Sequence, residues 1–194
     1  MLSRLSLWLL NYSTRWTALI SVIVFTLFTV FALPGQSAGS AAQSGMTSSP
    51  DLSFYYSAQE LYRMAESYGS EGRMDYISAR FTFDLVWPLV YGFFLVVTLG
   101  WLAKIAFPAE RIWQRVNLFP LFGMIFDYLE NISTSLVMAR YPAQTPIVDW
   151  MAGIFTALKW ILIGGSFILL VAATLLAIWK KLSQIKGKNE QGGG

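Results

Sequence analysis

The stretch from Phe126 to Ser133 carries two carboxylates and an amide within an apolar run from Leu118 to Ala139. Asp127, Glu130 and Asn131 are three and four residues apart, so they share one face if this run is a helix. Placing a charge at the centre of a bilayer costs roughly 2.5–3.5 kcal/mol on insertion scales. A membrane helix with two such side chains must pair them with partners. Ionisable residues in this position typically mark ligand sites or proton relays.

The composition excludes several kinds of chemistry. The chain of 194 residues contains neither Cys nor His, which removes thiol chemistry, disulfides, Cys/His metal sites and histidine bases. The sequence has no phosphate loop and no nucleophile motif. We therefore expect no cofactor and no metal, although carboxylates alone can bind metals, and we name no catalytic residue. The net charge of +3 does not indicate a nucleic-acid partner, because the basic residues cluster at the ends of apolar runs.

The hydrophobic pattern predicts an all-α, polytopic membrane protein. The residues are 55% hydrophobic and only 13% charged, against about 25% charged in soluble domains. A membrane helix needs roughly 20 apolar residues. Four runs fit a four-helix bundle that forms one membrane domain over residues 1–194: 16–33, 83–107, 118–140 and 147–179. We expect the first run to be an uncleaved anchor rather than a signal peptide, and residues 1–15 to form an interfacial helix.

Residues 34–82 lie between the first two spans and predict a short amphipathic helical segment outside the membrane. Gly35–Pro50 has the composition of a flexible linker. Ser57 and Glu60 have the spacing of a capping box, so a helix begins there. Gly69 is placed to end that helix. The segment acts either as a lid over the bundle or as a passive connector.

The distribution of Lys and Arg predicts that both termini are cytoplasmic, in a multi-pass protein of the cell (plasma or inner) membrane. One side carries Arg4, Arg15, Lys104, Arg111, Arg115, Lys180, Lys181, Lys186 and Lys188. The other side carries Arg63, Arg73, Arg80 and Arg140 among Asp51, Glu60, Glu66, Glu71, Asp75 and Asp149. The basic tail at 180–194 is expected to be cytoplasmic and disordered.

The tight turn at 141–146 indicates which residues lie at the same depth. The third and fourth spans leave this turn in opposite directions, so residues equally distant from its centre are level. Lys159 is therefore expected beside Asp127 and Glu130. We predict a buried ion pair between Lys159 and one of these carboxylates. Two carboxylates against one lysine leave one excess negative charge, which favours binding of a proton or a cationic ligand.

Further polar residues are assigned to the same site. Counting across the longer loop after the second span places Tyr91 near Glu130, and we expect Tyr91 and Asn131 to be hydrogen-bond partners of the ion pair. Asp84 falls nearer the outer surface, and Pro88 removes the helical donor for its carbonyl group. In the fourth span, the pair at residues 164–165 predicts close helix packing.

Several of these features together resemble a group of uncharacterised bacterial four-span membrane proteins. The similarity covers about residues 80–170 and depends on Asp127, Glu130, Asn131, Pro120, Tyr141-Pro142 and Lys159. The resemblance implies a four-span fold. It implies no activity, because none is assigned to the group.

Three functions fit the sequence. The first is a membrane protein that binds a small molecule, a lipid or a proton at the buried polar site, with transport as one form of this function. Such a protein is expected to form a homo-oligomer, because four helices enclose little volume. The second is an intramembrane lipid-modifying enzyme with a carboxylate acid or base. The third is a structural or accessory subunit in which the polar layer fixes helix register. We favour the first.

Overall fold

The computed structural model describes residues 1–34, 49–110 and 113–191, and in these ranges every regular element is helical. The all-α prediction is therefore confirmed for the described part of the chain. Most of the expected linker, Arg111 of the basic cluster and the last three residues lie outside the described residues.

The chain begins with two helices that meet at a sharp bend. Helix α1 (Leu2–Tyr12) and helix α2 (Arg15–Phe31) are inclined at 88° to each other. The predicted helix is therefore confirmed, with one of its faces buried, and its interfacial location stays a prediction. Ser6 donates a hydrogen bond to Asn117 Oδ1 at 2.8 Å, and Asn117 Nδ2 donates to the Ser6 carbonyl at 3.2 Å. These bonds fix α1 to the short 3-10 helix η2 (Trp113–Leu118).

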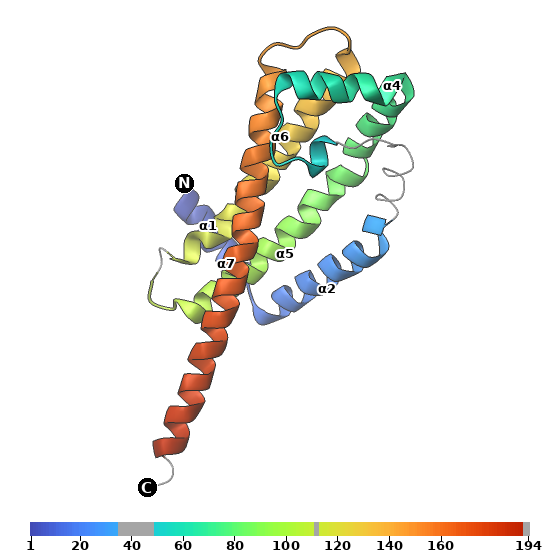
Figure 1. Cartoon of the computed structure of the whole chain (residues 1–194). Helices are drawn as coiled ribbons and strands as arrows, with labels where there is room; N and C mark the ends of the chain where they lie inside the picture. Colours follow the sequence, from blue (N-terminus) through green and yellow to red (C-terminus); the bar gives the residue numbers. More distant parts are fainter. Residues whose placement is uncertain (35–48, 111–112, 192–194) are drawn as a thin grey trace.

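Three long helices form the body of the protein: α5 (Phe83–Ala106), α6 (Phe119–Arg140) and α7 (Val148–Gln191). The first two agree closely with the predicted spans, and α5 runs through Pro88 as one helix. The expectation of a disordered tail from residue 180 is wrong as far as Gln191, because α7 continues to that residue. At 1.5 Å per residue α7 is about 66 Å long, and its C-terminal part extends beyond the other helices (Figure 1).

Two stretches of the described chain are long and apolar enough to cross a membrane: Ala58–Ala106 and Val148–Ile185. The bent pair α1 and α2 adds a third if it counts as one span. Helix α6 is not among them, because its polar side chains lower its mean hydropathy. The structure therefore gives two or three candidate spans.

Helix α4 (Ala58–Arg80) lies across the ends of α6 and α7 (Figure 1). The predicted capping box is confirmed: the Ser57 N–H donates to Glu60 Oε2 at 2.8 Å, and the Glu60 N–H donates to Ser57 Oγ at 3.3 Å. The helix bends at Gly69, which has φ +64°, so the predicted break is also confirmed. A short 3-10 helix, η1 (Pro50–Leu52), lies ahead of α4. We call residues 49–82 the outer segment, after the side of the membrane predicted for them.

Glycines in α5 and α6 allow the helices to approach closely. A Cβ atom at Gly92 would lie 1.9 Å from Met124 Sδ, and one at Gly123 would lie 2.9 Å from Ile163 Cγ1. Cβ atoms at Gly164 and Gly165 would meet no atom within 4 Å. The prediction that residues 164–165 mediate close packing is therefore wrong. A sequence cannot indicate which glycine faces a neighbouring helix.

Candidate functional site

The polar residues of α6 meet a lysine from α7. Lys159 forms an ion pair with Glu130, and its Nζ lies 3.7 Å from Asp127 Oδ1. The three residues are almost completely buried, with exposed fractions of 0% for Glu130, 6% for Lys159 and 8% for Asp127. The predicted ion pair is confirmed. We call Asp127, Glu130 and Lys159 the buried triad.

Helix geometry explains why these side chains meet. Asp127 and Glu130 are three residues apart on α6, so both point toward α7. The antiparallel connection between α6 and α7 brings Lys159 to the same depth. Gly123, one turn of α6 away, allows that helix to pack tightly on α7. The charges are thus enclosed by the contact between two helices.

Tyr91 of α5 closes the third side of the site. Its hydroxyl donates a hydrogen bond to Asp127 Oδ2 at 2.7 Å. The predicted hydrogen bond from Tyr91 to the charged residues is therefore found. The neighbouring Gly92 makes room for Met124 and so brings α5 close to α6 at this level. Asp127 therefore connects α5, through Tyr91, with α7, through Lys159.

Asn131 does not take part in the way we predicted. It is buried, with 4% of its surface exposed, but its Nδ2 has no hydrogen-bond partner among the described residues. It lies one turn from Asp127 on α6, yet its buried amide nitrogen binds neither carboxylate of the triad. Ser135, one turn further along α6, also has a buried hydroxyl without a hydrogen-bond partner in the described part of the chain.

Thr156 and Tyr56 belong to the site, and the sequence reasoning missed both. Thr156 Oγ1 lies 2.7 Å from Glu130 Oε1, 2.9 Å from the carbonyl oxygen of Ala152 and 3.0 Å from Tyr56 Oη. Thr156 precedes Lys159 by three residues on α7, so helical spacing was a usable signal for it. Tyr56 lies in the segment before α4, where no periodic pattern marks it, yet only 1% of it is exposed.

The Tyr56 phenol keeps its proton at neutral pH. Burial raises its pKa above the ordinary value for tyrosine, and the nearby Glu130 carboxylate raises it further. The neutral phenol accepts from Thr156 Oγ1, which also lies within hydrogen-bond distance of Glu130 Oε1. A line of hydroxyl groups therefore leads from the outer segment to the buried triad.

Asp84 belongs to a neighbouring cluster rather than to the triad. Its Oδ2 lies 2.6 Å from Arg80 Nη1, and the same guanidinium binds both oxygens of Asp51. Arg80 also lies over the ring of Tyr76, 4.4 Å from its centroid. Arg80 and Asp51 come from the outer segment, so this cluster fixes that segment to the start of α5. Asp84 therefore lies at the α4 end of α5, and its position on the outer side stays a prediction.

The arrangement of the triad favours proton or cation chemistry. Two carboxylates share one ammonium group, and two hydroxyl donors hold the carboxylates in place. No group of three or more His, Cys, Asp or Glu side chains that could hold a metal ion occurs among the residues that the structure describes.

No protein-family model matches the chain, and no curated protein and no solved structure is significantly similar to it. The resemblance to uncharacterised bacterial four-span proteins therefore stays a prediction. Any proposal about function depends on the geometry of the site itself.

Proposed function

We propose that this protein is a four-span protein of the cell membrane whose buried triad binds one proton or one small cationic molecule. The observation that carries the proposal is the charge balance of the site. Glu130 and Asp127 share Lys159 as their partner, and all three are buried. One excess negative charge in such surroundings is unfavourable, and a proton or a cation neutralises it.

The local hydrogen bonds suit a group that changes its protonation state. Thr156 has one hydroxyl proton and three acceptors within reach: the Glu130 carboxylate, the Ala152 carbonyl oxygen and the Tyr56 hydroxyl. With Glu130 charged, Thr156 donates to the carboxylate. With Glu130 protonated, the acid donates to Thr156, which then donates to Ala152. Both states leave these polar groups satisfied.

The same proposal includes four spans, formed by α2, α5, α6 and α7. Pairing of the α6 charges within the bundle offsets the cost of placing them in the membrane. Arg15, Lys104 and Lys180 lie toward one end of the bundle, which supports cytoplasmic termini. The Lys104 Nζ donates to the Leu10 carbonyl at 2.9 Å, and Lys180 bonds to the carbonyl of Ala106. On this orientation α4 and Tyr56 close the triad from the outer side.

The chain contains no cysteine, so single cysteines give a direct test of the topology. Glu71 and Lys181 are both exposed. In intact cells a membrane-impermeant maleimide is expected to label Glu71→Cys but not Lys181→Cys. Equal labelling of both, or labelling of Lys181→Cys alone, would overturn the proposed orientation.

Infrared spectroscopy tests the function by following carboxyl protonation. We expect a protonated carboxyl band in the purified protein that changes with pH and is lost in Glu130→Gln or Asp127→Asn. Asp84→Asn is the matched control, because Asp84 pairs with Arg80, and it is expected to keep the band. A spectrum without such a band in the wild type would indicate a permanently charged, structural ion pair.

Native mass spectrometry tests for a molecular ligand. A species bound by the wild type and lost from the Glu130→Gln, Lys159→Met double variant would name the ligand. Identical bound species in both proteins, together with no titrating carboxyl group, would favour an accessory role over the proposed one.

A further inference from the structure

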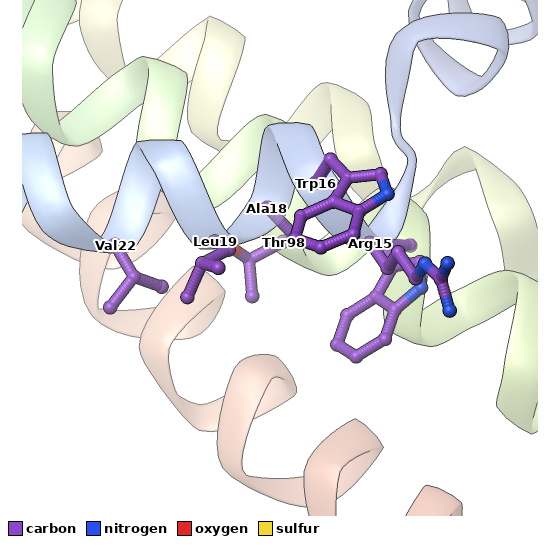
Figure 2. Close-up of a pocket in the computed structure, with 7 residues that line it drawn as sticks. Arg15, Trp16, Ala18, Leu19, Val22 and Thr98 are labelled. Atoms are coloured by element: carbon purple, nitrogen blue, oxygen red, sulfur yellow. The ribbon is translucent and has the colours of Figure 1, made fainter.

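A groove of about 590 Å³ lies between α2 and α5, away from the buried triad (Figure 2). This volume is in the usual range for small-molecule sites, about 300–1,000 Å³. Its lining combines one basic residue with mainly apolar and aromatic side chains: Arg15, Trp16, Leu19, Val22, Thr98 and Trp101. The groove therefore has a charged end and an apolar length.

The apolar side chains of α2 lie open to the surroundings along the groove. Trp16, Leu19 and Val22 are 62%, 50% and 39% exposed. The polar groups beneath them are satisfied, since Ser21 Oγ lies 3.4 Å from Thr98 Oγ1 and donates to the Ala18 carbonyl at 2.8 Å. The length of the groove thus offers contact for a hydrocarbon chain.

Arg15 differs from the other basic residues at this end of the bundle. Lys104 and Lys180 each bond to the last carbonyl groups of a helix. The Arg15 guanidinium forms no salt bridge with the described residues, and its Cζ lies 5.1 Å from the centroid of the Trp16 ring. Its charge is therefore available to an anion at the mouth of the groove (Figure 2).

We propose that this groove binds one anionic phospholipid, with the phosphate on Arg15 and an acyl chain along Leu19 and Val22. Charge complementarity selects this occupant: basic pockets between membrane helices bind anionic head groups, and the adjoining apolar wall fits the chain. The proposal rests on the proposed placement of α2 in the membrane and is independent of what the triad binds.

The first test is native mass spectrometry of the full-length protein, released from bilayers with equal amounts of phosphatidylglycerol and phosphatidylcholine. We expect the wild type to retain phosphatidylglycerol preferentially. Arg15→Gln is expected to lower that retention about fivefold, which corresponds to about 1 kcal/mol for one basic residue. Arg4→Gln, an exposed basic position on α1 outside the groove, is the matched control and is expected to behave like the wild type.

The second test fills the apolar part of the groove and keeps Arg15. Val22→Trp, with Leu19→Phe as a second variant should the first fold poorly, is expected to lose the retained phosphatidylglycerol. Glycerol phosphate, which has the charge without the chains, is expected not to displace the lipid. Unchanged retention in Arg15→Gln or in the filled variants would overturn the proposal. So would displacement by glycerol phosphate, or a wild-type dimer that Val22→Trp converts to a monomer without any loss of lipid.

Discussion

Replacement of Gly153 by alanine tests how the outer segment closes over the buried triad. Gly153 lies on α7, and a Cβ atom there would be 2.0 Å from the carbonyl oxygen of Tyr56. An ordinary contact between carbon and oxygen is about 3.3 Å, so the two groups must separate by about 1.3 Å. Helix α7 is continuous at this point, so the movement falls on the segment that contains Tyr56.

The displacement is large enough to break the hydrogen bond between Tyr56 and Thr156. Their oxygens are 3.0 Å apart, and an added separation of about 1.3 Å exceeds the range of a hydrogen bond. Overpacking of a buried contact typically costs about 1–3 kcal/mol. We expect docking of the outer segment to weaken by that amount, which raises the population of the open state about 5- to 150-fold.

Cysteine labelling measures this opening. Met138→Cys provides the reporter, because Met138 is 1% exposed and packs in one cluster with Tyr56. Maleimide should label Cys introduced at this position faster in the Gly153→Ala background, by the factor given above. Gly164→Ala is the matched control on the same helix, since its added Cβ meets no atom within 4 Å. A folded Gly153→Ala protein with the same labelling rate as the control would refute the argument.

Three further predictions concern the site. Lys159→Met should destabilise the protein by about 3–5 kcal/mol, because it leaves buried carboxylates without their counter-charge; adding Glu130→Gln should recover part of this loss in thermal unfolding. Tyr91→Phe should lower the free energy of unfolding by about 1.5–3 kcal/mol, the value of a hydrogen bond to a charged group. Tyr128→Phe loses a bond to a backbone carbonyl and should lower the free energy of unfolding by about 1 kcal/mol. An equal loss at both positions would contradict a charged Asp127. Burial raises the pKa of Tyr56 in the folded state, so the contribution of this tyrosine to stability is complete below the unfolded pKa of about 10 and is lost as the pH rises above that value. The alkaline decrease in melting temperature should therefore be shallower in Tyr56→Phe than in the wild type. Identical slopes in the two proteins would argue against a raised pKa of Tyr56.

The sequence determined the helices and the depth of the main charges. Hydrophobic runs of span length became α5, α6 and much of α7, because such runs favour continuous helix. The capping box at Ser57 and the break at Gly69 depend only on neighbouring residues, and both were found. Lys159 reached its carboxylates because a short turn between antiparallel helices fixes the relative depth of the residues on either side.

Only the tertiary structure decided which faces meet and what closes the site. Tyr56 reaches Thr156 across 100 positions of the chain, and Arg80 draws Asp84 into a separate cluster. The two closest contacts fall at Gly92 and Gly153, while the glycines at 164–165 meet no neighbour within 4 Å. These features depend on the rotation of each helix about its axis and on the docking of the outer segment. Both are set by packing between distant parts of the chain, which local spacing does not record.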